Sequence, residues 1–350
     1  MKNQRNMVSQ KNLAGRVLTW AMVVALCGLM GTTVQAESLA IGTTSVGSAP
    51  YVVSVGIAEM ITRDAGISVT VESSGGADAI ARLLGAGKVQ LGMLNSFAAE
   101  HAFKGDFQFK KTGKIPVRAL IWGNASLRQP VATKASGIKT IADFKDKRIL
   151  GRRKVGRDTI LVFEALIKAY GLKDTDMKVM TYSRPNEIMD AFKGRVAHAA
   201  IWPASAPNPL ILQLQETVEL SYPSIPKDKW DEVLGSLGPA FFMASIKPNT
   251  YKNQPEEIFV PGIQMGLSTV KTLPEDAGYK ITKALMGNYD KLKAYHPTAR
   301  DWTLEATLQQ WSAPFHPGAV KYFKEIGAWT SDMDKKQSKV LSLELSGPVK

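Results

Sequence analysis

The sequence predicts an α/β fold of two lobes, each a largely parallel sheet flanked by helices, with a ligand cleft between the lobes. From Leu39 onward, a short apolar strand, a turn rich in Gly, Ser and Thr, and a helix follow one another repeatedly. Strands separated by helices in this way are typical of βαβ units and a parallel sheet. A similar order recurs after residue 148, and the chain is long enough for two domains of about 150 residues each.

The first 36 residues have the order of a cleavable export signal. Four cations and no acidic residue precede an apolar run at 17–30, and a small-residue site follows at 34–36. The apolar run is shorter than the ~20 residues that span a bilayer, so cleavage after Ala36 is favoured over a permanent anchor. We therefore expect a signal peptide at 1–36 and a mature protein in the periplasm. The four cations are Lys2, Arg5, Lys11 and Arg16.

The only cysteine, Cys27, lies in this apolar run, so the mature chain would carry no disulfide, thiol nucleophile or thiolate metal site. Lipid attachment at Cys27 is the alternative, although Leu26 is bulky where a lipoprotein signal has a small residue.

Removal of the signal lowers the formal net charge from +13 to +9, with 40 Lys and Arg against 31 Asp and Glu. A positive field of this size attracts an anionic solute or an acidic surface, or reflects a solvated basic face. Because the cations are scattered and the protein is exported, no nucleic-acid partner is expected.

Two βα units and a third strand are expected to open the first lobe. Residues 39–41 form a strand, 51–63 have apolar residues at helical spacing, and 68–71 alternate as a strand. The Ser-Ser-Gly-Gly segment at 73–76 leads into a helix that ends near Gly85 or Gly87, and 89–94 form the third strand.

The second lobe is expected to repeat this order. Residues 148–150 are strand-like, Asp158 can cap a helix at 159–170, and 178–182 form the next strand. Ser183 can cap a helix that stops at Gly194, and another strand follows. Further helices are expected at 274–292 and 317–326. No low-complexity linker divides the chain, so we expect strands, and not a flexible tether, to join the lobes.

A short local repeat supports two lobes of like topology. Residues 87–94 and 194–201 each follow a helix and share a Gly-(Lys/Arg)-Val opening, at a spacing of 107 residues. Chance is the alternative for so short a match. If the repeat is real, the loops of both lobes face one cleft, because ligands on open α/β sheets bind outside the carboxyl ends of the strands.

Residues suited to binding a small acid follow the predicted strands. Free N–H groups and the positive dipole end at helix N-termini favour an anion such as a carboxylate, and an arginine fork can bind it bidentately. Tyr182 and Trp202 could form an aromatic wall over the ligand. The hydroxyl, amide and guanidinium groups are those of Thr43, Thr44, Ser45, Ser73, Ser74, Asn95, Arg157 and Thr159, with Arg152 and Arg153 nearby.

Each of these residues also has a structural interpretation. Hydroxyl side chains form turns and cap helices, and the three arginines can form a solvated basic face. Tyr182 and Trp202 can belong to the core.

No catalytic or metal-binding constellation is present in the sequence. The four histidines are scattered, and neither His-Glu-x-x-His nor Gly-x-Ser-x-Gly occurs. The glycine spacing at 42–48 matches a phosphate loop, but Ser48 stands where a lysine is required. We therefore expect a binding protein with no cofactor and no metal, and not an enzyme. An enzyme on this fold would need a reactive partner for Asp158 or His198.

Segments over nearly the whole mature chain resemble the TAXI type of substrate-binding proteins of TRAP (tripartite ATP-independent periplasmic) transporters. Their order and spacing carry the resemblance. They are Ile41–Thr43 with the loop to Tyr51, Glu72–Gly76, Leu83–Gly92, Ser136–Arg148, Ala204–Pro209, and His316–Ala319 before Tyr322.

The resemblance implies a type II-like periplasmic binding protein, whose lobes close on a ligand and hand it to a membrane permease driven by an ion gradient. Small organic acids and acidic amino acids are the implied ligands, and Tyr51 and Ser205 join the implied ligand-binding residues. We expect a monomer with lobe 1 at 37–126 and 265–350 and lobe 2 at 127–264. A binding protein that reports its ligand to a membrane sensor is the alternative.

The sequence departs from the resemblance at the second-lobe loop. Where the family has a glycine-rich Gly-Ser-Gly-Thr segment, residues 151–159 contain fewer glycines and three arginines. The ligand therefore cannot be copied from relatives.

Overall fold

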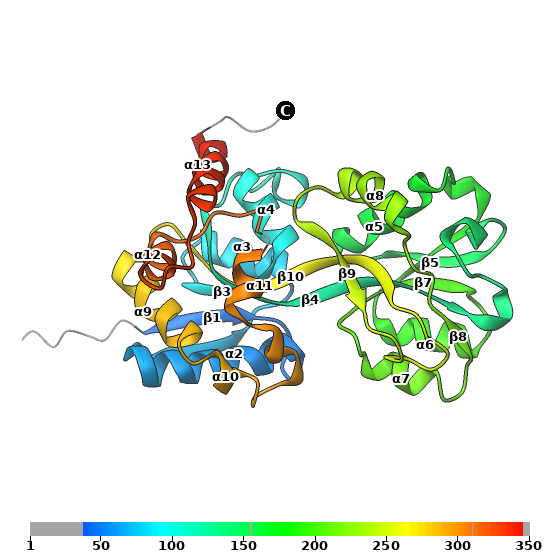
Figure 1. Cartoon of the computed structure of the whole chain (residues 1–350), viewed down its shortest axis with the longest axis horizontal. Coiled ribbons are helices and arrows are strands. Elements are labelled where there is room, and N and C mark those ends of the chain that lie inside the picture. The colour runs from blue at the N-terminus through cyan, green and yellow to red at the C-terminus, as the bar shows by residue number, and fades with distance from the viewer. Residues whose placement is uncertain (1–37, 155, 310, 346–350) are drawn as a thin grey trace, which may run out of the picture. The chain divides into compact units, whose positions relative to one another are not determined.

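A single mixed sheet runs through the part of the chain that the computed structural model describes, which is residues 38–154, 156–309 and 311–345 (Figure 1). The predicted signal peptide and Cys27 lie outside these residues. The sheet order is β2-β1-β3-β10-β4-β7-β5-β6, while β8 pairs with β4 and β9 with β10. Its strands are β1 (Leu39–Thr43), β2 (Val69–Ser73), β3 (Leu91–Asn95), β4 (Val117–Thr133), β5 (Arg148–Arg153), β6 (Lys178–Tyr182), β7 (Ala199–Ala204), β8 (Leu220–Ser221), β9 (Phe241–Ile246) and β10 (Ile258–Val270).

Two parallel groups of three strands form the halves of this sheet. In the first lobe β1 pairs in parallel with β2 and β3, and in the second lobe β5 pairs in parallel with β6 and β7. A helix follows each of these strands, as the βαβ pattern predicts. The helices are α2 (Ala49–Met60), α3 (Ala77–Gly85), α4 (Ser96–Lys104), α5 (Arg157–Ala169), α6 (Pro185–Lys193) and α7 (Pro209–Leu214). The predicted two-lobed α/β fold is confirmed.

The long antiparallel strands β4 and β10 join the two lobes. Pairing of β4 passes from β10, along residues 117–127, to β7 along residues 127–132. Strand β10 also changes partners along its length, because it pairs first with β9 and then with β3. The prediction that strands connect the lobes is thus confirmed. The expected boundaries at 126/127 and 264/265 fall inside these strands, and the division itself stays a prediction.

Burial on both faces explains the apolar runs of the parallel strands. In the second lobe, adjacent residues such as Ile149 and Leu150, or Ile201 and Trp202, belong to two separate hydrophobic clusters. Successive side chains of a strand point to opposite faces, so α5 and α8 (Trp230–Leu237) cover one face while α6 and α7 cover the other.

The local repeat corresponds to equivalent positions in the two lobes. Residues 87–94 lead into β3 and residues 194–201 into β7, and each strand is the one beside a long antiparallel strand. The turns differ in detail. Gly87 takes a positive φ of 68° in the first lobe, whereas in the second the positive φ of 57° belongs to Arg195.

Two predicted helix caps are wrong. The N-cap of α5 is Gly156, at φ 122°, and Asp158 is the second residue of the helix. Its carboxylate is bound by Arg128 instead. Helix α6 begins at Pro185, because proline suits the first helical position, so its N-cap is Arg184 and not Ser183.

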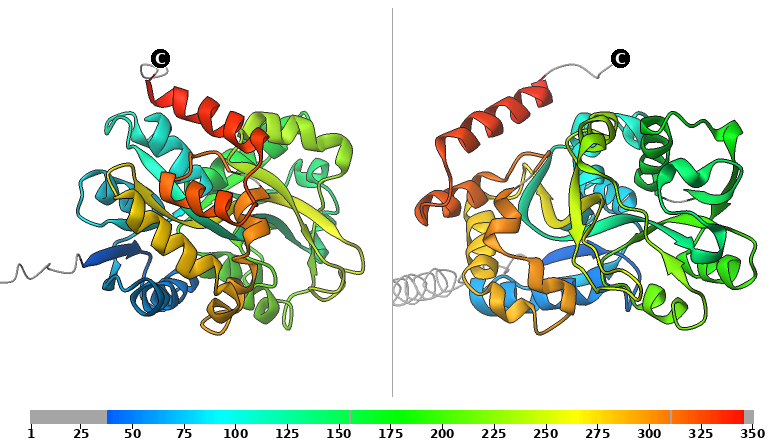
Figure 2. Two further views of the ribbon diagram at one scale, coloured as in Figure 1. Left: turned by 60° about the vertical axis from the view of Figure 1, so that its left-hand side comes forward. Right: turned by 45° about the vertical axis from the view of Figure 1, so that its right-hand side comes forward.

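The C-terminal part adds helices to the first lobe. The segment expected as one helix at 274–292 is divided into α9 (Glu275–Met286) and α10 (Tyr289–Leu292), and the helix expected at 317–326 is α12 (Pro317–Glu325). Between and after them lie α11 (Leu304–Gln309) and α13 (Ser331–Leu345). Helix α13 stands out from the rest of the lobe (Figure 2), and Glu344 ties its end to Arg118 and Lys271. No helix among the described residues is both long and apolar enough to span a bilayer.

Candidate ligand site

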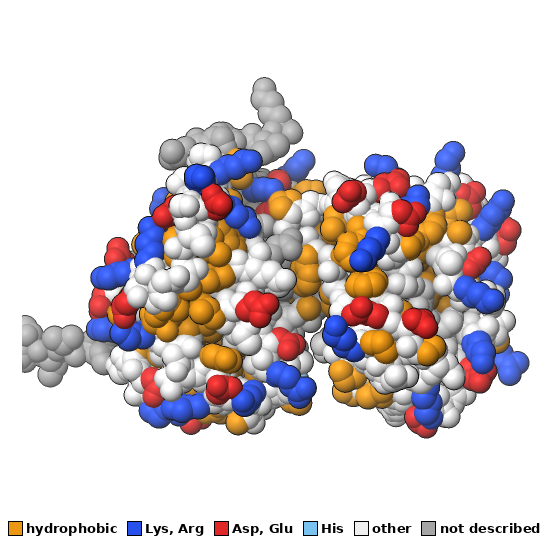
Figure 3. All heavy atoms as spheres, in the orientation of Figure 1, with side chains coloured by type: hydrophobic (Ala, Val, Ile, Leu, Met, Phe, Trp, Pro, Cys, Tyr) orange, Lys and Arg blue, Asp and Glu red, His pale blue; other side chains and the backbone are white. Residues whose placement is uncertain are grey.

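The loops at the carboxyl ends of the parallel strands form the candidate site, because ligands bind there on open α/β sheets. A groove separates the two lobes on the face shown in Figure 3. Contacts also cross between the lobes near β3. The Ser96 hydroxyl donates to the Ala240 carbonyl at 2.7 Å and accepts from the Gln264 N–H at 3.2 Å, and Phe97 packs edge to face on Phe241.

The loop after β1 is held by its own hydroxyl groups. Thr43 is buried and accepts a hydrogen bond from Ser54 at 3.0 Å, and the Thr44 and Ser48 hydroxyls are 2.7 Å apart. Ser48 caps α2 by accepting from the N–H of Tyr51, which is half-buried, while Ser45 is exposed. Thr43 and Thr44 therefore shape this loop, and Ser45 leaves its hydroxyl open to solvent.

The loop after β2 ends at a helix N-terminus that has no side-chain cap. The Ser74 N–H donates to the Thr43 carbonyl at 2.8 Å, which joins this loop to the first, and Ser73 is exposed. Gly75 has φ 100°, and Gly76 is the N-cap of α3. The first N–H groups of α3 have no intrahelical acceptor, so they are available to an anion.

Asn95 contributes an amide at the end of β3. Its Oδ1 accepts from the Ala98 N–H at 2.7 Å and so caps α4. The side chain is half-buried, and its NH2 group remains as a donor after the cap is made.

In the second lobe, α5 also begins without a side-chain cap, at Gly156. Thr159 is fully buried, and within the described residues its hydroxyl oxygen has no hydrogen-bond partner. As at α3, the free N–H groups and the positive dipole end of this helix lie on the carboxyl-end side of the sheet, where the candidate site is.

An ion pair between Arg128 and Asp158 anchors this helix start to β4. Both side chains are buried, and the Arg128 Nε donates to the Asp158 carboxylate at 2.5 Å while Nη2 contacts the same oxygen. Nη1 donates to the carbonyls of Ser126 and Leu127. Sequence reasoning missed Arg128. The sequence did contain a signal for this ion pair: Arg128 stands in a largely apolar strand, where a buried charge needs an acidic partner.

The three arginines of the second-lobe loop have different surroundings. Arg152 binds Asp174 and lies 3.9 Å from Glu164, and the Arg153 Nε donates to the Ser183 carbonyl at 3.4 Å. Arg157 is the first residue of α5, is exposed, and has no acidic partner among the residues the structure describes. Of the three, Arg157 is the exposed one, whereas Arg152 and Arg153 are half-buried.

The two aromatic residues lie in the core of the second lobe. Tyr182 is 1% exposed, and its hydroxyl donates to the Ile201 carbonyl at 2.7 Å. Burial raises the pKa of this hydroxyl well above its usual value. Trp202 is fully buried, so neither ring forms an open wall in this structure. Ser205, past the end of β7, is half-buried, and its carbonyl accepts from Gln129 at 3.3 Å.

A carboxylate at the start of α3 gives the site a negative component. Burial raises the pKa of Asp78, a hydrogen bond of 3.0 Å from Gln108 opposes this, and the charge of Asp158 raises it further. Since Asp78 belongs to the first lobe and Asp158 to the second, the two carboxylates interact across the lobes. The site therefore contains both donors for an anion and two acids.

One family model and several solved structures are similar to this chain. The model of the NMT1-like family matches residues 41–327. PhnD1 from Prochlorococcus marinus, solved in complex with methylphosphonate, is 9% identical with a TM-score of 0.50 over 84% of this chain and 100% of that chain. The periplasmic aliphatic sulphonate binding protein SsuA from Escherichia coli is 13% identical over 88% and 86%, with a TM-score of 0.45. A TRAP periplasmic solute binding protein from Rhodobacter sphaeroides is 14% identical over 87% and 91%, also at 0.45.

Replacing Asp158 by alanine should strongly destabilise the protein, because it leaves the Arg128 charge buried and unpaired. Loss of one partner of a buried pair costs about 3–5 kcal/mol of unfolding free energy, measured by urea denaturation. Arg157→Ala, at the adjacent exposed position, should change it by no more than about 0.5 kcal/mol. If Asp158→Ala does not fold, the double replacement Arg128→Met with Asp158→Leu should restore folding. Equal effects of Asp158→Ala and Arg157→Ala on the unfolding free energy would contradict a stabilising buried ion pair between Asp158 and Arg128.

Replacing Asp78 by asparagine should stabilise the protein at neutral pH. The folded-state pKa of Asp78 is raised above its unfolded value, so the folded state binds more protons in the window between the two values. Wild-type stability therefore falls as pH rises through this window, and the variant lacks that fall. Urea denaturation at neutral and acidic pH should show a gain for Asp78→Asn at neutral pH that shrinks on acidification.

Asp143→Asn supplies the control of opposite sign. Backbone N–H groups of Lys139 and Thr140 lower the pKa of Asp143, so its ionised form stabilises the fold above its unfolded pKa and this stability is lost on acidification. Asp143→Asn should therefore lower stability at neutral pH. A pH profile for Asp78→Asn that runs parallel to the wild type would contradict the raised pKa.

Proposed function

Because the chain belongs to the NMT1-like family, we propose that it is a periplasmic solute receptor, which binds a small organic anion between its lobes and delivers it to a TRAP-type membrane permease. The observation that supports an anion most is that α3 and α5 each begin at a glycine N-cap, Gly76 and Gly156, with no side chain capping the helix. One comes from each lobe, and both follow the carboxyl end of a parallel strand. Donors from two lobes favour a ligand that bridges them.

In this proposal, each group has a role in ligand binding that follows from its charge and its hydrogen-bonding capacity. Backbone N–H groups at the two helix starts would bind a carboxylate, with Arg157 supplying a charged fork. The amide of Asn95 and the hydroxyls of Ser45 and Ser73 would bind polar groups of the ligand. Thr43, Thr44, Tyr51, Ser74 and Thr159 would shape the surrounding loops, with Tyr182, Trp202 and Ser205 behind them.

The carboxylate of Asp78 favours an acidic amino acid over a simple organic acid within this class. Asp78 lies in the first turn of α3, next to the N–H groups proposed to bind an anion. A ligand with an ammonium group as well as carboxylates would pair with Asp78, whereas a purely anionic ligand would meet it as a like charge.

Closure of the lobes would give this binding its role in transport. Ligand that contacts both lobes shifts the population toward the closed state, which the permease can distinguish from the open one. The export signal of the sequence supports a periplasmic location, and the resemblance to TAXI proteins supports a TRAP permease as partner. The protein would act as a monomer.

A library of organic and amino acids should identify the ligand by thermal stability. Ligand at 100 times its dissociation constant stabilises the folded state by about 2.7 kcal/mol, so a true ligand raises the melting temperature of protein freed of co-purified solute. We expect acidic amino acids and small carboxylates to be the compounds that do so. A complete library without a shift would count against the proposal.

The Arg157→Ala variant tests how the ligand is bound. Loss of a charge-assisted hydrogen bond should weaken binding of the best carboxylate by about tenfold in calorimetry. Arg152→Ala is the matched control in the same loop, since Arg152 is paired with Asp174, and it should change affinity by less than about twofold. Equal affinities for both variants would remove Arg157 from the site.

A further inference from the structure

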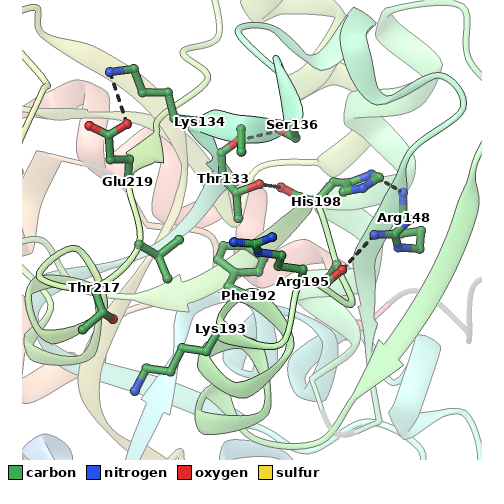
Figure 4. A pocket seen from close by; sticks show the side chains of 13 residues that line it. Thr133, Lys134, Ser136, Arg148, Phe192, Lys193, Arg195, His198, Thr217 and Glu219 are labelled. Atoms are coloured by element: carbon green, nitrogen blue, oxygen red, sulfur yellow. Dashed lines mark hydrogen bonds and ion pairs between the residues drawn. The ribbon is translucent and has the colours of Figure 1, made fainter.

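A second site is indicated at the opposite end of the second lobe. A cavity of about 770 Å³ lies where β5 begins at Arg148, where β4 ends at Thr133, and just before β7 at His198 (Figure 4). These are the amino ends of the parallel strands, away from the loops of the candidate ligand site. The volume is that of a small-molecule site.

The cavity carries an excess of positive charge. Four cations line it, at Lys134, Arg148, Lys193 and Arg195, against a single acid, Glu219. Lys134 lies 3.5 Å from Glu219. Four cations against one acid leave a formal excess of three positive charges. Within the described part of the chain, neither Lys193 nor Arg195 is in an ion pair with an acidic residue.

Arg148 is fixed in place without being neutralised. Its Nε donates to the Val196 carbonyl at 2.5 Å and Nη2 to the Arg195 carbonyl at 2.8 Å, both neutral acceptors. His198 lies in the same wall of the cavity. Burial lowers the pKa of its imidazole, and the positive charges of Arg148 and Lys147 lower this pKa further. A cation held in this way is preorganised for an anion.

The turn that carries Arg195 is strained. Arg195 has a φ of 57°, whereas in the equivalent first-lobe turn Gly87 takes the positive φ and Lys88 does not. A left-handed conformation is unfavourable for an arginine, because its Cβ approaches the following carbonyl oxygen, and such residues gather at functional sites. The turn directs the Arg195 guanidinium into the space between Thr133 and Phe192 (Figure 4).

An apolar floor lies beneath these cations. Phe192 and Ala197 line the cavity at 1% exposure each, and Val218 lines it at the side. A site of this composition suits a molecule with a multiply charged group and an organic part.

We propose that this cavity binds a phosphoryl group carried on an organic molecule. The dianion would lie among Arg148, Arg195 and Lys193, because arginine forks and an ammonium group match phosphate oxygens. The organic part would pack on Val218, which is half-buried, because Phe192 and Ala197 are only 1% exposed. This site is separate from the proposed solute cleft and goes beyond the proposed function.

Calorimetric titration with phenyl phosphate tests the site directly. Arg195→Gly removes the guanidinium, so it should weaken binding by about tenfold or more. Glycine adopts a positive φ without strain, so the variant should keep or raise the melting temperature. Lys88→Ala, in the equivalent first-lobe turn, is the matched control and should change affinity by less than about twofold. Binding that is absent in the wild type, or equal in wild type and Arg195→Gly, would overturn the proposal.

Two further probes distinguish the source of the phosphoryl group. Binding of glycerol 3-phosphate that requires Arg195 would indicate a soluble ester. Binding to vesicles of phosphatidic acid in phosphatidylcholine, but not to vesicles of phosphatidylcholine alone, that requires Arg195 would indicate a lipid headgroup, because phosphatidic acid carries a terminal phosphate monoester. Binding of either probe that is indifferent to Arg195→Gly counts against the site.

Discussion

Pairing between β4 and β10 is the constraint on which the rest of the structure depends. These two antiparallel strands lie side by side in the centre of the sheet, and each exchanges partners from one lobe to the other along its length. Two glycines allow close packing at this pair: Gly266 of β10 leaves space for Trp122 of β4, and Gly123 of β4 leaves space for Trp302. The same strand β4 carries Arg128, so the position of α5 in the second lobe is set from the strand that links the lobes.

The electrostatics of the candidate site follow from this arrangement. Two helix starts and Arg157 supply donors, while Asp78 and Asp158 supply acids, one from each lobe. Asp158 is paired with Arg128, whereas Asp78 accepts a hydrogen bond from Gln108 and is in no ion pair among the described residues. The strongly cationic cavity lies elsewhere, at the amino ends of the second lobe's strands. Net positive charge alone therefore does not predict which of the two proposed sites binds an anion.

Periodicity predicted the fold well because each βα unit is encoded locally. The strand at 178–182 matches β6 residue for residue, and the Gly-(Lys/Arg)-Val repeat marked equivalent strands. Long-range contacts were beyond such reasoning. Asp158 looks like a helix cap in sequence, and only the fold brings it to Arg128, 30 residues away. The roles of the predicted ligand-binding residues stay predictions, because a site between two lobes depends on how loops that are far apart in the sequence face one another.

The most direct test of a solute receptor that binds an anion between its lobes is a crystal structure of the protein with its tightest carboxylate ligand. The ligand should contact both lobes, with a carboxylate at the N–H groups of α3 or α5 and within hydrogen-bond distance of Arg157. A carboxylate ligand bound to one lobe alone, or away from both helix starts, would contradict the account.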